Sequence, residues 1–326
     1  MIRPRELKSE LQVSLSHDAF STTTKLWNIL VASREGNLAA VKELVNECPE
    51  LIYGQYNYAP PIHFAVREGH PDLVKYLLDN GAHDPEYKIY PFSDSLVTIA
   101  QDRGLTEIVA LLEEYNRQPA LCKFKGDNGE INYNWTESQT EFQTAVSKND
   151  LDKVKGILIS HPEFARDENY FWGEGILTMP AKKGHFEMVE LLMSYGAKVP
   201  DVLKWTQFYY FERYENAEFM IQKGMNPNVM SWHHVTLLHD MAQKGDIRKA
   251  ELLIKHGAEI DPIEEQYQST PLGMAARWGH TAMVEYLLSK KADPNKAGTR
   301  WSTPMTWVQK NGMHDIEKML RNSGAN

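Results

Sequence analysis

A helical hairpin that recurs along the chain is the sequence feature that most restricts the fold. Its clearest copy runs from Ser269 to Asn295 and contains two short blocks, each with apolar residues on one side only. Thr270 and Pro271 suit the first turn of a helix, because the hydroxyl accepts an orphan amide and proline has no amide to leave unpaired. Gly279 permits a sharp turn between the blocks. The stretch therefore predicts two paired helices, neither of which can bury its apolar side alone.

The same pattern returns at a nearly constant interval. The turn glycines Gly245, Gly279 and Gly312 are 34 and 33 residues apart. Earlier copies have a glycine in the same place at Gly69, Gly104 and Gly184, and weaker copies centre on Gly36, Asn149 and Glu212. These nine copies cover residues 24–326. Units that cannot bury their own apolar faces must stack on one another, so the pattern predicts a solenoid.

The repeat resembles an ankyrin repeat in its length of about 33 residues and in its start. Thr270-Pro271-Leu272 matches the family's opening, although Gly273 stands in the usual histidine position. The resemblance implies an all-α solenoid of about nine helix-turn-helix repeats that acts by binding and needs no cofactor. It also implies that His63 and His239 belong to the position whose imidazole bonds the backbone of a neighbouring turn.

The predicted organisation follows from where the repeats begin and end. An inserted β-hairpin is expected because polar and apolar residues alternate on both sides of Gly126–Gly129. This hairpin either covers the joint between repeats three and four or binds a partner. The predicted segments are an N-terminal cap or tail at 1–23, repeats one to three at 24–115, the hairpin insertion at 116–138, repeats four to six at 139–230, and repeats seven to nine with a C-terminal cap at 231–326.

Repeat six departs from the pattern. Only seven residues separate Gly196 from Leu203, where its first helix is predicted to start, whereas thirteen separate the corresponding residues Gly257 and Thr270. The turn finger before this repeat is therefore missing. The first helix also carries bulky residues where repeat eight has two alanines. We expect a change in stacking angle and a wider groove at this repeat.

Composition disfavours several function classes. The net charge of -9 argues against a nucleic-acid binder, whose affinity comes mainly from Lys and Arg on phosphates. Cys48 and Cys122 lie in different repeats, so free thiols in a reducing compartment are expected. No stretch of about 20 apolar residues is present, and membrane spanning is not expected. These features together favour a cytoplasmic location.

The sequence offers little chemistry. It contains no nucleophile elbow, phosphate loop, metalloprotease pair or paired-cysteine metal box, so we expect no enzyme activity. The His233-His234 pair with His239 is the one histidine cluster, but His239 belongs to the repeat framework, and no metal site is expected. The adjacent pair Glu264-Glu265 is expected to be solvated.

Aromatic residues give the stronger signal. In ankyrin repeats the partner surface is concave and combines the turn fingers with the two residues before each turn glycine. Trp and Tyr at such places are typical of binding hot spots. The alternative is that Phe171, Trp172 and Phe211 turn inward to fill the space left by the missing finger. The candidate partner-binding residues are Phe171, Trp172, Lys182, Lys183, Tyr210, Phe211, Trp232, His233, Lys244, Tyr267, Arg277 and Trp278.

The sequence therefore predicts a non-catalytic scaffold that binds a protein or peptide through an aromatic concave groove. Basic residues on the same face favour a partner with acidic segments, although the total charge is negative. The alternative is a small-molecule or glycan site in the widened groove at repeats five to seven. An enzyme with an unrecognised site is a third interpretation. A closed pocket would favour the small ligand, and a long open trough would favour a protein.

Overall fold

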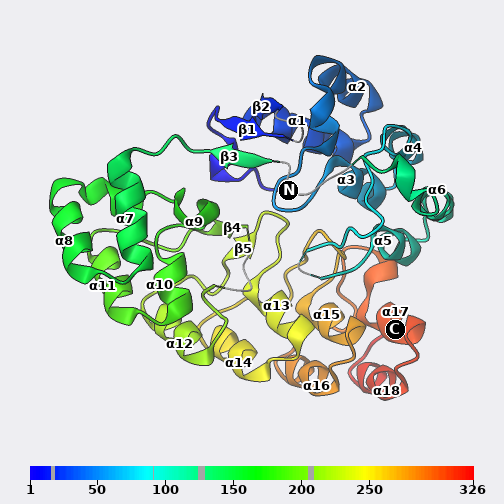
Figure 1. The fold of residues 1–326 in the computed structure, drawn as a ribbon. Coiled ribbons are helices and arrows are strands. Elements are labelled where there is room, and N and C mark those ends of the chain that lie inside the picture. The colour runs from blue at the N-terminus through cyan, green and yellow to red at the C-terminus, as the bar shows by residue number, and fades with distance from the viewer. Residues whose placement is uncertain (16–18, 91, 124–128, 205–208) are drawn as a thin grey trace. The chain divides into compact units, whose positions relative to one another are not determined.

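The computed structural model of the protein describes residues 1–15, 19–90, 92–123, 129–204 and 209–326 (Figure 1). Most elements in these residues are short helices joined in pairs, as the repeats predict. The chain divides into two compact units. One unit is Arg5–Asn134, and the other combines Met1–Pro4 with Trp135–Asn326.

The unit Arg5–Asn134 contains the first three helix pairs. First helices pack on first helices, α1 on α3 and α3 on α5, and the second helix α4 packs on α6. This side-by-side packing buries the apolar faces that single hairpins leave open. The helices are α1 (Thr23–Glu35), α2 (Leu38–Glu47), α3 (Pro61–Glu68), α4 (Pro71–Asp79), α5 (Leu96–Asp102) and α6 (Thr106–Asn116).

A three-stranded antiparallel sheet completes this unit. Its strands are β1 (Gln12–Ser14), β2 (Phe20–Thr22) and β3 (Glu130–Asn132), in the order β2-β1-β3. The predicted strand after Gly129 is confirmed as β3, which pairs with β1. The hairpin of the structure is β1–β2, and residues 124–128 lie outside the described residues. An isolated hairpin is marginally stable in water, whereas pairing with β1 leaves Ile131 of β3 buried.

The unit that includes Trp135–Asn326 continues the solenoid. First helices α13, α15 and α17 pack in sequence, and second helices α12, α14, α16 and α18 form a parallel row, visible from green to red in Figure 1. The stacked repeats confirm the predicted fold class. The helices are α7 (Glu137–Ser147), α8 (Leu151–Ser160), α9 (Tyr170–Gly173), α10 (Thr178–Lys183), α11 (Phe186–Ser194), α12 (Tyr214–Gln222), α13 (Leu237–Lys244), α14 (Ile247–Lys255), α15 (Pro271–Arg277), α16 (Thr281–Ser289), α17 (Pro304–Lys310) and α18 (His314–Asn322).

Repeat six differs from its prediction. The expected helix start at Leu203 is wrong, because Val202–Leu203 forms strand β4, parallel to β5 (Met230–Ser231). The shortened connection leaves this segment extended beside the finger of repeat seven, where the Trp232 amide donates to the Leu203 carbonyl at 3.2 Å. Phe208 lies outside the described residues. The second helix of the repeat, α12, is retained.

A histidine that precedes the second helix bonds the preceding repeat in two places. His280 Nε2 lies 2.6 Å from the Gln243 carbonyl, and His70 Nε2 lies 2.9 Å from the Arg34 carbonyl in the other unit. A side chain at Gly245 would place its Cβ 2.8 Å from the His280 ring. Glycine is therefore favoured at this turn for two reasons: it leaves room for the His280 ring, and it accepts a φ of +67°.

Candidate partner-binding surface

Trp172 is displayed on the surface of repeat five by an unusual backbone. Its side chain is 52% exposed, whereas its neighbour Phe171 is buried. Both residues have left-handed backbones, with φ of 48° at Phe171 and 64° at Trp172, which is uncommon for side chains other than glycine. The Phe171 amide donates to Gln143 Oε1 at 2.9 Å, and the Gly175 amide donates to the Tyr170 carbonyl at 3.0 Å. These bonds turn one aromatic ring inward and the next one outward.

Tyr209 adjoins the Trp172 indole, and Lys182 lies beside Tyr209. The rings of Trp172 and Tyr209 are nearly parallel, with an interplanar angle of 18° and centroids 6.3 Å apart. Lys182 Nζ lies 5.3 Å from the centroid of the Tyr209 ring. It also lies 3.7 Å from Glu212 Oε2, an exposed ion pair. The cluster offers a partner two aromatic faces and an ammonium group, the groups that bind aromatic and anionic side chains.

A second cluster of a cation with aromatic rings forms at repeat eight. The Arg277 guanidinium lies 4.5 Å from the ring centroids of Tyr267 and Trp278 and 5.0 Å from that of Trp307. Trp307 Nε1 donates to Ser269 Oγ at 2.9 Å, which fixes its ring. Tyr267 and Trp307 are buried, whereas Arg277 and Trp278 are half-buried. Only the latter two residues can contribute to a surface here.

Five predicted contact residues belong to the core. The Tyr210 hydroxyl lies 3.0 Å from Thr178 Oγ1 and donates to the Glu174 carbonyl at 3.1 Å. Burial raises the pKa of this hydroxyl well above its usual range. Because the rings of these five residues fill interior space, the prediction that they are accessible to a partner is wrong. The inward orientation given as the alternative holds for Phe171 and Phe211. The buried residues are Phe171, Tyr210, Phe211, Trp232 and Tyr267.

The predicted basic residues lie at the ends of first helices. Lys183 Nζ donates to the Ser147 carbonyl at 2.9 Å, and Lys244 Nζ pairs with Asp240 Oδ2 at 2.8 Å. Both lysines are exposed, and Lys182 is half-buried. With Trp172, Arg277, Trp278 and the half-buried His233, these residues remain candidates for contact with a partner.

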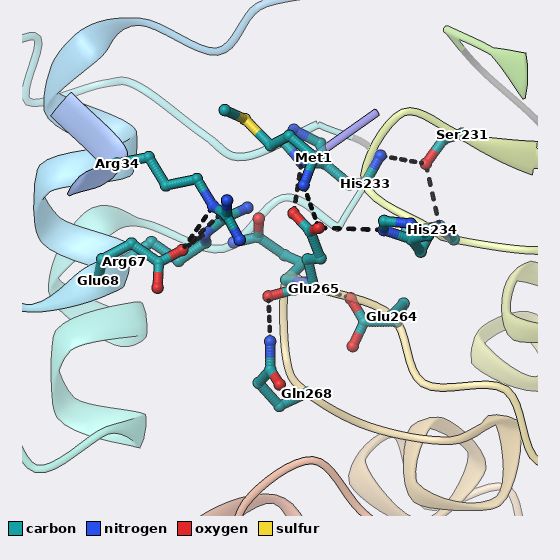
Figure 2. A network of polar contacts seen from close by, with 12 residues as sticks. Met1, Arg34, Arg67, Glu68, Ser231, His233, His234, Glu264, Glu265 and Gln268 are labelled. Carbon is teal, nitrogen blue, oxygen red and sulfur yellow. Dashed lines mark hydrogen bonds and ion pairs between the residues drawn. The ribbon is translucent and has the colours of Figure 1, made fainter. Parts of the chain in front are cut away.

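The Glu264-Glu265 pair is not the solvated pair that the sequence suggested. Glu264 is fully buried, and its carboxylate accepts backbone N–H bonds from Tyr267 at 2.8 Å and from Ser269 at 3.1 Å. These bonds shape the finger of repeat eight and direct Tyr267 inward. Glu265 faces His234 Nδ1 at 3.0 Å and also pairs with the Met1 ammonium (Figure 2). Its carboxylate thus links the finger of repeat seven to residue 1.

His239 has the framework role that the family position implies. Its Nε2 lies 3.1 Å from the Ser269 carbonyl, and its Nδ1 lies 2.9 Å from Thr236 Oγ1. Burial lowers the pKa of this imidazole to about 4, so it is neutral at pH 7. Within the part of the chain that the structure describes, no group of three or more His, Cys, Asp or Glu side chains is arranged to hold a metal ion.

Asp240 is a buried acid that the sequence analysis missed. It is 1% exposed, and burial outweighs Lys244 and raises the pKa of its carboxyl to about 6. Alignment of the repeats could have identified it, because Asp240 stands where repeat eight has Met274 and repeat nine has Trp307. An acid at a position that is apolar in other repeats departs from the repeat pattern, and burying its carboxylate costs free energy.

Among the residues that the structure describes, no helix combines the length and the apolar character needed to cross a bilayer.

Comparison with known proteins identifies the repeats. A sequence model for three copies of the ankyrin repeat matches residues 209–298 and 238–326, and a model for one ankyrin repeat matches residues 57–88. An ankyrin repeat domain of Acinetobacter baumannii AYE, known from a crystal structure, aligns with a TM-score of 0.47 and 20% identity. That alignment covers 58% of this chain and 100% of the other.

Curated relatives match over different lengths. The human transient receptor potential cation channel subfamily A member 1 is 22% identical over 332 residues, which cover 90% of this chain and 26% of the channel. Palmitoyltransferase ZDHHC17 of Danio rerio is 34% identical over 95 residues, and palmitoyltransferase ZDHHC13 of Mus musculus is 35% identical over 94 residues. Each match covers 29% of this chain and 15% of the transferase. The chain thus spans about a quarter of the channel and less of the transferases.

The sequence matches agree with the structure. The three-copy model covers repeats seven to nine, where α13, α15 and α17 pack in sequence, and the single-repeat model covers α3 and α4. The ankyrin fold is typically non-catalytic, and its repeats generally mediate protein–protein interaction. The chain is therefore an ankyrin-repeat protein.

Proposed function

We propose that the protein is a non-catalytic scaffold that binds a protein or peptide segment, with Trp172, Tyr209 and Lys182 as its main anchor. The observation that carries this proposal is the 52% exposure of Trp172 on a left-handed backbone. A non-glycine residue in this conformation costs on the order of 1–3 kcal/mol. An exposed indole contributes little to core packing, so folding does not offset this cost. A binding role for the ring explains why the conformation is kept.

The geometry of the anchor favours tight contact. The Tyr209 ring supports one side of the indole, so Trp172 loses little rotational freedom when a partner covers it. Tryptophan is also among the residues that contribute most to protein interfaces. The anchor is thus arranged in advance of binding.

Charge favours a partner with acidic segments. Lys182 belongs to the anchor, Lys183 follows it in sequence, and Arg277 lies with Trp278 at repeat eight. Their local charge is positive although the chain carries a net charge of -9. We extend the proposal to a cytoplasmic location and to a protein partner in preference to nucleic acid or a membrane surface.

The test compares two substitutions of exposed apolar residues. Trp172→Ala removes the anchor, and Ile159→Ala removes a side chain that is 77% exposed on second helix α8. Wild type and both variants are used for affinity capture with quantitative mass spectrometry, and each captured protein is then titrated in purified form. Loss of a hot-spot tryptophan weakens binding by about thirtyfold or more, since it costs about 2 kcal/mol.

The outcomes separate the rival functions. Partners lost by Trp172→Ala and retained by Ile159→Ala support the proposal. An unchanged set of partners for Trp172→Ala refutes it. A small molecule or glycan that remains bound in native mass spectrometry and is lost from Trp172→Ala would favour the small-ligand alternative.

A further inference from the structure

A second pair of exposed aromatic side chains lies in the unit Arg5–Asn134. Tyr58, in the finger of repeat two, is 42% exposed, and Tyr90, in the finger of repeat three, is 39% exposed. Their ring centroids are 5.5 Å apart, and the ring planes are tilted by 49°. Two large aromatic rings from successive fingers therefore adjoin each other at the surface.

The backbone at Tyr58 does not favour a tyrosine. Asn57 and Tyr58 are both left-handed, with φ of 51° and 61°, and a β-bridge joins Tyr56 to Ala59 on either side of them. Two such residues form a tight hairpin turn, in which asparagine followed by glycine is preferred. The Tyr87 hydroxyl donates to the Tyr58 carbonyl at 2.8 Å and so helps to hold the turn. The turn explains the asparagine, but it does not explain the exposed tyrosine.

Repeat five has the same arrangement. Trp172 and the residue before it are also consecutive and left-handed, the second of the two rings is exposed, and the adjoining ring of Tyr209 belongs to the next repeat. Tyr58 and Trp172 are 114 residues apart, and each follows a 3-10 helix that begins with proline, Pro49–Tyr53 in one repeat and Pro162–Arg166 in the other. The turn residues differ, Asn-Tyr against Phe-Trp. The two repeats thus share the strained turn and the exposed ring, and not the residues themselves.

The two aromatic pairs differ in the cation that accompanies them. At repeat five, Lys182 is half-buried and its Nζ lies 5.3 Å from the centroid of the Tyr209 ring. The equivalent residue of repeat two, also two positions before the turn glycine, is Arg67. Arg67 is 2% exposed, and its Nη2 donates to Glu68 Oε1 at 2.6 Å (Figure 2). A buried and bonded arginine does not offer its charge to a partner at this pair.

The surroundings of Tyr58 and Tyr90 favour an uncharged ligand. The two exposed charged residues that precede Tyr90 in its finger, Glu86 and Lys88, are of opposite sign. Proline suits adjoining aromatic rings, because its own ring packs on their faces and its polyproline II conformation is formed before binding. We propose that Tyr58 and Tyr90 form a second anchor, which binds an uncharged, proline-containing segment of a protein. This goes beyond the function proposed above, since it adds another surface with a ligand of different chemistry.

The first test lets the protein select its ligand. Short random peptides displayed on phage are selected in parallel on wild type and on Tyr58→Gly, and peptides recovered only with wild type are sequenced. Proline is expected to be enriched several-fold in these peptides over the unselected library. Synthetic copies in which alanine replaces each proline are expected to bind wild type about fivefold more weakly or worse, because the chain must then be ordered on binding.

The second test separates binding from folding. Tyr58→Gly places glycine where the turn prefers it, so this variant is expected to melt about 1–3 °C above wild type. It should nevertheless bind a selected proline peptide about fivefold more weakly or worse in fluorescence anisotropy titrations, as should Tyr90→Ala. The matched control is Phe20→Ala, which removes a ring that is 56% exposed on β2 of the same unit. The control is expected to change the affinity by about twofold at most. Circular dichroism establishes that each variant is folded.

The outcomes decide between the two anchors. Selection of no peptide that depends on Tyr58 overturns the proposal, as does equal affinity of wild type, Tyr58→Gly and Tyr90→Ala for the selected peptides. Selection of acidic peptides without proline also overturns it, in favour of a charged ligand. If Tyr58→Gly loses proline peptides while Trp172→Ala leaves all captured partners unchanged, the second anchor is retained and the first is rejected. The reverse pattern retains the first anchor and rejects the second.

Discussion

Replacing Asp240 by asparagine tests the energetics of the buried acid directly. The two side chains have nearly the same shape, but asparagine cannot ionise. Asp240 is 1% exposed, and its Oδ1 has no hydrogen-bond partner among the residues that the structure describes. Lys244 supplies one ion pair at 2.8 Å through Oδ2. The pKa of the carboxyl nevertheless rises to about 6 from 3.8, because burial is the largest contribution.

The direction of the pH effect follows from this rise. Since the folded-state pKa lies above the unfolded value, the folded protein holds the proton more tightly than the unfolded chain does. The stabilising contribution of the protonated carboxyl is complete below about pH 4 and is lost as the pH rises through the folded pKa of about 6. A difference of two pKa units corresponds to about 3 kcal/mol of unfolding free energy.

The assay is urea unfolding of wild type and Asp240→Asn at several values between pH 4 and pH 7.5. The free energy of unfolding of the variant, relative to wild type, is expected to increase by about 3 kcal/mol across this range. His239, whose pKa is lowered to about 4, titrates in both proteins and largely cancels in the difference. Asp152→Asn, at an exposed position on α8, provides the control. A difference that stays constant with pH for Asp240→Asn would refute the assignment of a raised pKa.

Three further substitutions test the backbone and the core. Trp172→Gly should be more stable than Trp172→Ala by about 1 kcal/mol in thermal melts, because glycine accepts a φ of 64° without strain. Gly245→Ala should cost about 1–3 kcal/mol in urea unfolding, since it combines a left-handed backbone with a close approach to the His280 ring. Tyr210→Phe should cost about 1 kcal/mol in the same assay through lost hydrogen bonds, with no pH dependence below pH 9. A more stable Trp172→Ala, a neutral Gly245→Ala or a neutral Tyr210→Phe would each contradict the structural reason given for that residue.

The repeat framework could be predicted because its signals are local. Thr270 and Pro271 begin α15 as their chemistry requires, and the Thr270 hydroxyl accepts the Gly273 amide at 3.2 Å. Gly279 has the left-handed backbone that the turn needs. Such choices depend on a few adjacent residues, so they can be inferred from sequence. His239 was predicted equally well, because the family position implies its partner.

Long-range pairing and side-chain direction could not be predicted in this way. Alternation identifies Glu130–Asn132 as a strand, but it does not distinguish a partner at residues 121–125 from one more than 100 residues away. The sequence also does not predict which of two adjacent aromatic rings points outward. Phe171 and Trp172 have similar composition signals, yet the left-handed backbone that separates them depends on contacts with Gln143 and Gly175. Sequence therefore overestimated how many of the candidate aromatic residues are exposed.

Where a repeat lacks the usual side chain, the structure shows whether another group makes the corresponding hydrogen bonds. In repeat seven, His239 reaches the Ser269 carbonyl of the next finger at 3.1 Å. Repeat eight has Gly273 at the histidine position, and a Cβ there would lie 3.1 Å from Ser269 Oγ. Ser269 itself makes the corresponding link, since its hydroxyl donates to the Ser302 carbonyl at 3.1 Å and accepts the Trp307 indole N–H. The serine and the tryptophan together replace the imidazole, so Gly273 is compensated within the framework. Asp240 differs, because no group among the described residues compensates its Oδ1 with a hydrogen bond. We therefore expect a measurable effect on stability from the buried acid and not from the missing histidine.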